Sequence, residues 1–456
     1  MKRLARNARF VPILALLLVA APAQKQSTAK AAPVAAARLV SVKVKGSTRY
    51  TDKEVAAAGG LQIGQPAADG DFKEAVQRLG DSGMFSSASY SFISSPNGVR
   101  LELQVADTDP SKLVPAHFEN FVGFTDDELL TAIQHRVPLF KQLLPLSGSL
   151  PDRVSEALQT IIGDKQLPGR VSFLREGDES SGHLSGFAYR VDEVSIRIRN
   201  LEFPGASPEQ TELLTTAGRR LIGAEYARST LAATAKFDLL PVYLQRGYLK
   251  AAFAPSEARA VPESATPGPA TEPAPSTETQ GPVDLQVDAI VPVTPGKIYA
   301  TSAVDWKGNA VISSAELSSL LHLPPGQPAD GVRLVRDLET VTRLYRSRGY
   351  MLVQTKPDAQ FDDEKSSVHY DLNVVEGDQY KMGELEITGL DTQAKDRMMA
   401  SWTLREGQPY NAEYPNKFLE DTRQILPRGV EWGTTVHESL DAKSKTVDVE
   451  VHFKQR

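Results

Sequence analysis

Two kinds of residue pattern alternate along the chain. Stretches with an apolar residue at every second position, such as 368–374 and 447–453, predict strands with one buried face. Before each pair of such strands lie two segments with apolar residues at helical spacing, divided in most cycles by a glycine turn. The last two cycles match best, since the Gly-Gln-Pro turn that begins at Gly326 is repeated at Gly407. The pattern predicts one supersecondary unit that recurs along the chain.

Each cycle has the order strand, helix, helix, strand, strand. It recurs every roughly 75 to 100 residues, which is too long for the common short solenoid repeats and fits a string of small domains. The predicted fold class is α+β, in which every unit has a three-stranded sheet with two helices on one face. The second unit is the weakest match. The predicted units are residues 39–107, 111–191, 192–293, 297–376 and 377–456.

A glycine follows the second helix of several units. Gly83, Gly247 and Gly349 stand at this place, where the left-handed end of a helix favours glycine. In the second unit, residues 165–169 follow the second helix. We interpret the tyrosines after Gly247 and Gly349 as side chains that pack on the sheet; the alternative is that they contact a ligand.

The N-terminus has the pattern of a signal peptide at residues 1–23. Basic residues precede an apolar run at 10–21, which is too short to span a bilayer, and a small-x-small cleavage site follows. The alternative is an uncleaved anchor. Residues 24–38 are interpreted as a flexible leader, with a short helix as the alternative.

A second biased segment, residues 255–282, is dense in Pro, Ala, Thr, Glu and Ser. This composition cannot form a core, so we expect a disordered loop within the third unit. The strand pattern at 283–287 should resume the same domain; the alternative is a linker between two domains.

Composition narrows the possible partners. The 456-residue chain has a net charge of −6, and nucleic acid is not expected as a partner because phosphate binding needs a concentrated basic face. The chain has no cysteine, so neither a disulfide nor a cysteine-linked lipid anchor is expected.

Sequence motifs give no sign of catalysis. The short motifs of metalloproteases, α/β-hydrolases, P-loop proteins and dinucleotide-binding proteins do not occur. The histidines are scattered, with none three or four residues from another. The acidic run at 362–364 is interpreted as a solvated hairpin turn. We therefore expect no catalytic residue, no metal site and no cofactor; the alternative is an exported hydrolase whose motif is not recognised.

The order of elements and the glycine positions resemble those of the POTRA domain. Residues 374–389, which read VVEGDQYKMGELEITG, are similar to the junction between two such domains in the BamA/TamA outer-membrane assembly family. The resemblance covers nearly all of the chain after the predicted signal peptide, and it is weak in the second unit. It implies tandem POTRA-like β-α-α-β-β domains in the periplasm.

The resemblance also implies a function. Domains of this family receive unfolded outer-membrane proteins and dock accessory subunits, partly by adding a strand to a sheet edge. We therefore expect a non-catalytic periplasmic scaffold, peripheral to the outer membrane at most. Its expected partners are a β-barrel protein or assembly complex of the outer membrane and unfolded outer-membrane clients. The alternatives are a structural protein of cell-envelope division or adhesion, or the N-terminal fragment of an assembly factor whose barrel would begin where this sequence stops.

The segments after Gly247 and Gly349 are the candidate partner-binding strands. They are short and mixed in polarity, so unpaired backbone groups at a sheet edge could bind an extended peptide. The alternative is an edge blunted by Lys250 and Lys356 that binds nothing. The candidate residues are Tyr248, Lys250, Ala252, Tyr350, Leu352 and Gln354.

Overall fold

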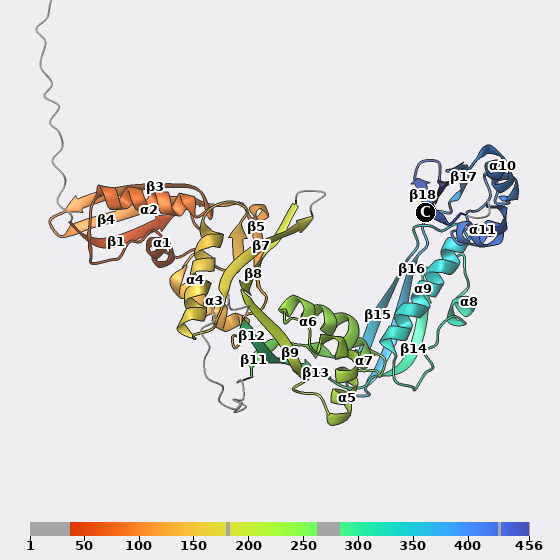
Figure 1. Ribbon diagram of the computed structural model, residues 1–456, viewed down its shortest axis with the longest axis horizontal. Coiled ribbons are helices and arrows are strands. Elements are labelled where there is room, and N and C mark those ends of the chain that lie inside the picture. The colour runs from red at the N-terminus through yellow and green to blue at the C-terminus, as the bar shows by residue number, and fades with distance from the viewer. Residues whose placement is uncertain (1–36, 179–182, 262–282, 427–429, 456) are drawn as a thin grey trace, which may run out of the picture. The chain divides into compact units, whose positions relative to one another are not determined.

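The computed structural model describes residues 37–178, 183–261, 283–426 and 430–455 (Figure 1). The predicted signal peptide, most of the predicted leader and residues 262–282 of the Pro-rich segment lie outside the described residues. The chain divides into two compact units, Met1–Asp109 and Pro110–Arg456. Within the described ranges, no helix combines the length and the apolar content needed to cross a membrane.

The fold class is α+β, as the sequence predicts. Within the described residues, five sheets of three or four strands follow one another along the chain, and we call each of these sheets with its helices a repeat. In every repeat the first strand lies parallel to the last strand, and the strand before the last lies antiparallel to it at an edge of the sheet. The β-α-α-β-β order therefore recurs five times.

Repeat 1 forms the N-terminal compact unit and has the strand order β2-β1-β4-β3. Its first helix begins with a capping box in which Thr51 and Glu54 satisfy each other's backbone N–H groups. The elements of repeat 1 are β1 (Ala37–Lys45), α1 (Asp52–Ala58), β2 (Pro66–Ala67), α2 (Asp69–Asp81), β3 (Phe85–Ser95) and β4 (Gly98–Asp107).

Repeat 2 has the equivalent order β6-β5-β8-β7. Its capping box joins Thr125 and Glu128. A short 3₁₀ turn, Pro110–Lys112, precedes its first strand. The elements are β5 (Leu113–Phe118), α3 (Asp126–Arg136), β6 (Leu143–Pro145), α4 (Leu150–Asp164), β7 (Arg170–Asp178) and β8 (His183–Asp192).

Repeat 3 has the order β11-β12-β9, so the strand that follows residues 262–282 lies in the middle of the same sheet. Its second helical segment is interrupted by a π-helical turn, Ala235–Leu239. Repeat 3 also contains a short 3₁₀ turn and short β segments. A separate ribbon pairs β10 with β13. The elements are β9 (Val194–Glu202), α5 (Pro208–Ala217), α6 (Arg228–Thr234), α7 (Leu240–Leu244), β10 (Ala252–Phe253), β11 (Glu257–Ala260), β12 (Val283–Ile290) and β13 (Val293–Thr294).

Repeats 4 and 5 have the orders β14-β16-β15 and β17-β19-β18. Repeat 4 consists of β14 (Ala300–Lys307), α8 (Ser314–Ser318), α9 (Gly331–Ser347), β15 (Gln354–Asp362) and β16 (Ser367–Val375). Repeat 5 consists of β17 (Lys381–Thr388), α10 (Thr392–Ser401), α11 (Tyr414–Thr422), β18 (Trp432–Asp441) and β19 (Thr446–Gln455).

The glycine turn between the two helices pairs with the first strand. Gly326 has a φ of +80°, and its N–H donates to the carbonyl of Thr301 over 2.8 Å. Gly407 and Met382 make the same bond in repeat 5, also over 2.8 Å. In repeats 1 and 2 this contact extends into the short strands β2 and β6, so the expectation of three-stranded sheets is wrong for these two repeats, which have four strands. The extra pairing is local to the turn.

A second glycine position ends the first strand and explains the weak match of repeat 2. A Cβ on Gly308 would lie 2.3 Å from the carbonyl oxygen of Val374 on the last strand, too close for any side chain. Repeat 2 has Asn120 there instead. Its amide group bonds both the N–H and the carbonyl of Val191, at 2.7 and 2.9 Å. A buried side-chain amide thus replaces the close backbone approach of the other repeats.

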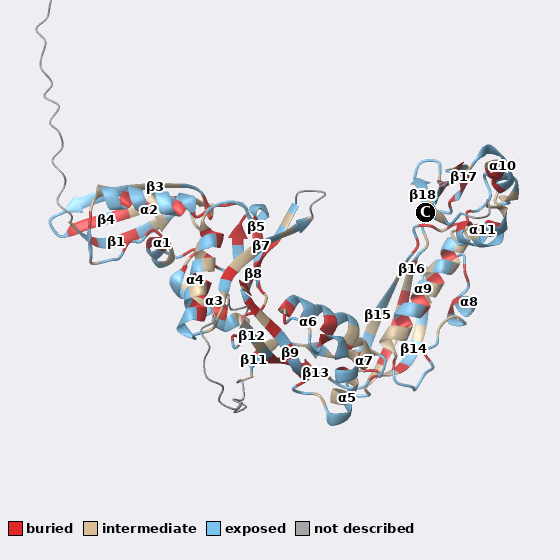
Figure 2. Cartoon of the chain, viewed as in Figure 1, coloured by how far each residue is buried: buried red, intermediate tan, exposed pale blue. Residues whose placement is uncertain are grey.

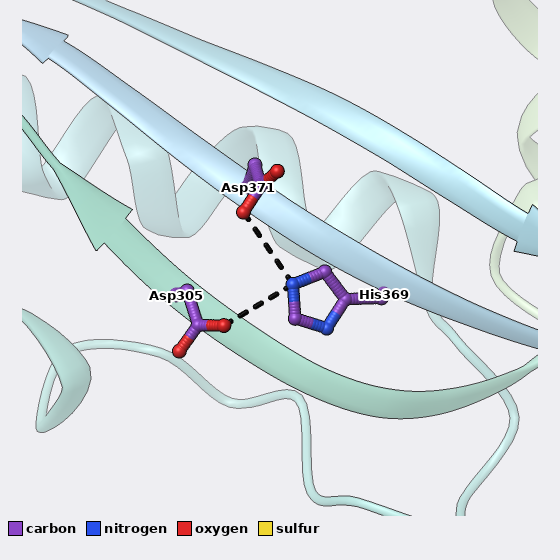
Figure 3. Close-up of side chains that lie close together, drawn as sticks. All are labelled: Asp305, His369 and Asp371. Atoms are coloured by element: carbon purple, nitrogen blue, oxygen red, sulfur yellow. Dashed lines mark ion pairs between the residues drawn. The ribbon is translucent and has the colours of Figure 1, made fainter.

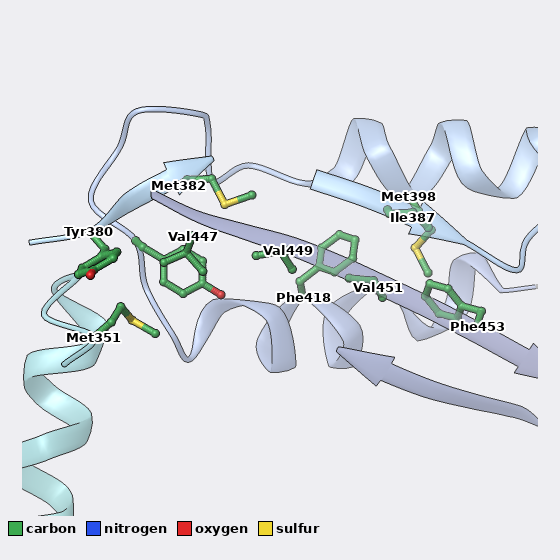
Figure 4. Packing of buried hydrophobic residues seen from close by; sticks show 11 residues of the cluster. Met351, Tyr380, Met382, Ile387, Met398, Phe418, Val447, Val449, Val451 and Phe453 are labelled. Carbon is green, nitrogen blue, oxygen red and sulfur yellow. The ribbon is translucent and has the colours of Figure 1, made fainter. Parts of the chain in front are cut away.

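The core of each repeat lies between its sheet and its helices. Along the central strands, buried residues alternate with half-buried ones in β16 and mostly with exposed ones in β19 (Figure 2). In repeat 5 the side chains of the central strand β19 pack against Phe418 of α11 and Met398 of α10 (Figure 4). The other face of the β19 alternation is exposed, so the helices cover one face of this sheet.

Candidate partner-binding site

The six candidate residues do not form two continuous strands. Tyr248, Lys250, Tyr350 and Leu352 lie in turns that follow the second helices of repeats 3 and 4. Ala252 lies in β10 and pairs with Thr294 in the separate ribbon. The expectation that strands begin directly after Gly247 and Gly349 is therefore wrong. Of the six residues, only Gln354 belongs to the edge strand of a main sheet; it begins β15 and pairs with Val375.

The turns after Gly247 and Gly349 instead connect neighbouring repeats. The carbonyl of Gly247 accepts the N–H of Tyr299 in repeat 4 over 2.8 Å, and the carbonyl of Gly349 accepts the N–H of Tyr380 in repeat 5 over 2.7 Å. A Cβ on Gly349 would lie 2.6 Å from the carbonyl oxygen of Tyr380. Glycine is required here by the approach of the next repeat as well as by the end of the helix.

Apolar residues from the same turns enter the core of the next repeat. Met351 is buried among the core residues of repeat 5 beside Tyr380 (Figure 4), and Leu249 packs on the core of repeat 4. The expectation that Tyr248 and Tyr350 pack on the sheet is only partly met. Tyr248 and Tyr350 make edge-on ring contacts with tyrosines of the preceding helices, at centroid distances of 5.6 and 6.1 Å. These turns are junction elements.

Lys250 connects repeat 3 to the β15–β16 hairpin of repeat 4. Its Nζ lies 2.7 Å from Asp363 Oδ1 and 4.6 Å from the ring centre of Phe361. Tyr299 donates its hydroxyl proton to the same Asp363 oxygen. The hydrogen bond from Lys250 holds the pKa of Asp363 below its usual value. The acidic run at 362–364 lies at the exposed turn of the β15–β16 hairpin, as expected, and Asp363 additionally makes a contact between repeats.

The edge of the repeat 4 sheet is the strand β15. It lies outermost in the sheet and pairs with β16 over its whole length from Gln354 to Asp362. Alternate residues of an antiparallel edge strand point their N–H groups outward. Proline is tolerated at such an edge where its missing N–H would face outward, away from the neighbouring strand. We therefore infer that the backbone of Pro357 faces outward, and that Thr355 and Ala359, two residues away on either side, face outward as well.

Residues of the helix α9 and of the edge strand β15 line a groove of about 570 Å³. Its apolar surface includes Val335, a residue of α9 that is 55% exposed. The hydroxyl oxygens of Thr342 and Thr355 lie 3.2 Å apart, within hydrogen-bond distance, so helix and strand are in contact at this point of the groove. The residues that line it are Val335, Leu338, Glu339, Thr342, Arg343, Arg346, Thr355 and Pro357.

A second groove, of about 1310 Å³, lies beside the first and shares Arg343 and Arg346 with it. Tyr414 and Phe418 of α11 and Val436 of the edge strand β18 line this groove in repeat 5. Both grooves therefore combine an edge strand with the second helix of its repeat. Two exposed arginines of α9 lie where the grooves meet.

None of the six predicted residues lines either groove, although Thr355 lies within the segment 350–356 that the sequence selected. Val335 is the residue that sequence reasoning missed most clearly. A signal was present, because an apolar residue that lies off the buried stripe of a helix is unexpected there. The binding role of the six residues stays a prediction.

Comparison with protein families matches residues 299–377 to POTRA, described as "Surface antigen variable number repeat". The POTRA resemblance predicted from the sequence is confirmed by this match, which coincides with repeat 4 and the start of its junction with repeat 5.

Solved structures that resemble the chain include POTRA3-5 of BamA from Haemophilus influenzae, with 17% identity, a TM-score of 0.41, and coverage of 57% of this chain and 96% of that one. The N-terminal domain of Omp85 from Thermosynechococcus elongatus also has 17% identity, with a TM-score of 0.23 and coverage of 58% and 99%. POTRA1-3 of Omp85 from Anabaena has 15% identity, a TM-score of 0.25 and coverage of 57% and 95%.

Proposed function

From the POTRA domain at residues 299–377, we propose that the chain is a non-catalytic periplasmic scaffold that assists the assembly or transport of outer-membrane proteins. It binds an extended segment of a client or partner protein by adding a strand to β15. The observation that carries this proposal is the edge strand β15 beside an open, partly apolar groove. Strand addition uses backbone hydrogen bonds, which tolerate many client sequences.

The groove supplies the side-chain selectivity that backbone bonding lacks. In an added strand, alternate side chains point toward α9 and would cover Val335 and Thr355, while the others face solvent. Arg343 and Arg346 are exposed at one end of the groove and favour acidic side chains there. The expected client segment therefore alternates apolar residues with polar or acidic ones.

Lys356 and Pro357 are the features that oppose strand addition. Charged residues and proline are common on edges that avoid pairing. The backbone N–H and carbonyl of Lys356 face β16, so they are not at the free edge. Pro357 removes only one backbone N–H group from the free edge of the strand. Donors at Thr355 and Ala359 remain on either side of it. The expected edge is restricted in register and is still able to pair.

Val335→Glu is expected to weaken peptide binding by about tenfold or more, equal to about 1.4 kcal/mol, because it places a charge in the groove. The measurement is fluorescence anisotropy with a labelled peptide in which valine alternates with threonine or glutamate. Leu174→Glu is the matched control, since Leu174 is 58% exposed on β7 of repeat 2 and receives the same charge. Equal binding by both variants would show that the groove beside β15 is not the binding site.

A further inference from the structure

A row of aspartates crosses the sheet of repeat 4. Asp305 on β14 pairs directly with Asp371 on β16, which in turn pairs with Asp358 on β15. Buried residues of β16, such as Tyr370 and Leu372, alternate with these positions, so the row lies on the face of the sheet that the core does not use. Like charges placed directly opposite each other on neighbouring strands are destabilising. The row therefore favours a bound positive charge.

His369 lies on the same face, two residues before Asp371 on β16. Its Nε2 is 3.2 Å from Asp305 Oδ2 and 3.4 Å from Asp371 Oδ1, and the two carboxylates approach the same side of the ring (Figure 3). The three ligand atoms all lie within 4.8 Å of one another. In a tetrahedral zinc site with bonds of about 2.0–2.1 Å, neighbouring ligand atoms lie about 3.3–3.4 Å apart. The two distances from His369 match that spacing.

The second oxygen of Asp371 already has a partner. Lys307 Nζ lies 2.8 Å from Asp371 Oδ2, so Oδ1 remains directed toward His369. An outer hydrogen bond of this kind orients a carboxylate that binds a metal. The side chain of Asp305 is 65% exposed, which leaves the site open to water.

We propose that Asp305, His369 and Asp371 bind one zinc-type divalent cation, with water completing its coordination. One imidazole and two carboxylates suit zinc, whereas calcium and magnesium prefer ligand sets made of oxygen alone. The cation would join β14 to β16 and neutralise the aspartate row. The proposal departs from the expectation of no metal site, which rested on the spacing of the histidines and on the acidic run at 362–364.

Calorimetric titration of the metal-free full chain with Zn²⁺ tests the proposal. We expect one ion per chain, with binding weakened by more than about 100-fold in His369→Gln, because loss of an outer partner alone costs about 10- to 100-fold. Asp305→Asn removes an exposed ligand and is expected to weaken binding by at least about tenfold. His322→Gln is the control, since His322 lies 3.1 Å from Asp337 in the same repeat but outside the site.

Three results would overturn the proposal. The first is that the wild-type chain does not bind zinc. The second is that the wild type, His369→Gln and Asp305→Asn bind zinc equally well. The third is that His322→Gln loses as much zinc affinity as His369→Gln. Circular dichroism verifies that each variant is folded. If His369→Gln alone fails to fold, unchanged binding by folded Asp305→Asn still contradicts the site.

Discussion

Arg228→Ala is expected to destabilise the contact between repeats 2 and 3 by about 1–3 kcal/mol, the range for leaving a buried hydrogen-bond acceptor without its donor. The Arg228 side chain is 9% exposed and bonds Asp126 Oδ1 on α3. It also donates to backbone carbonyls between the end of β5 and the start of α3, at Phe118, Phe121 and Phe124. Alanine would leave these buried acceptors without their donor.

Hydrogen exchange of the α3 and β5 amides measures this effect, because it reports the free energy of local opening in each repeat. Arg220→Ala is the matched control in the same repeat. Arg220 is 66% exposed and pairs with Asp238, and an exposed ion pair contributes up to about 1 kcal/mol. Similar exchange rates in the two variants would show that Arg228 does not hold repeat 2 to repeat 3.

Gly389→Ala is expected to destabilise repeat 5 by about 2–5 kcal/mol, from left-handed strain and overpacking together. Gly389 has a φ of +83°, and a Cβ would lie 1.8 Å from the carbonyl oxygen of Phe453 on the central strand β19. The contacting atom is backbone, so β17 and β19 would have to separate. Loss of that pairing would expose the core shown in Figure 4.

Gly407→Ala separates the cost of left-handed backbone strain from the cost of overpacking. Gly407 has a φ of +80°, nearly that of Gly389, but a Cβ there meets no atom within 4 Å. Its expected cost is only the left-handed strain, about 1–2 kcal/mol. Exchange of the β19 amides measures both variants. If both substitutions have the same effect, the close approach of Gly389 to Phe453 is not what fixes glycine at the end of the first strand.

The repeat order was predictable because its signals are local. Strand alternation and turn glycines lie within a few residues of the elements that they specify, as Gly326 and Gly407 illustrate. The short strands β2 and β6 were missed because they form only where the turn between the two helices pairs with the first strand of the same sheet. Asn120 obscured repeat 2 because it replaces a glycine by a different interaction with Val191.

The sites were harder to predict because their members are distant in the sequence. Asp363 meets Lys250 across 113 positions, and His369 meets Asp305 across the pairing of β14 with β16. The segment after Gly349 was selected for its polarity, but the next repeat buries Met351. The neighbouring repeat, which the local pattern does not describe, determines what these turns do.

Strand addition at β15 is tested most directly by hydrogen exchange of single amides, measured by NMR with and without the valine-containing peptide. The account predicts slower exchange at Thr355 and Ala359, whose N–H groups face the free edge, and unchanged exchange at Lys356 and Asp358, which already face β16. The amides of β14, at the opposite edge of the same sheet, should not change. Peptide binding that leaves Thr355 and Ala359 unprotected would contradict the account.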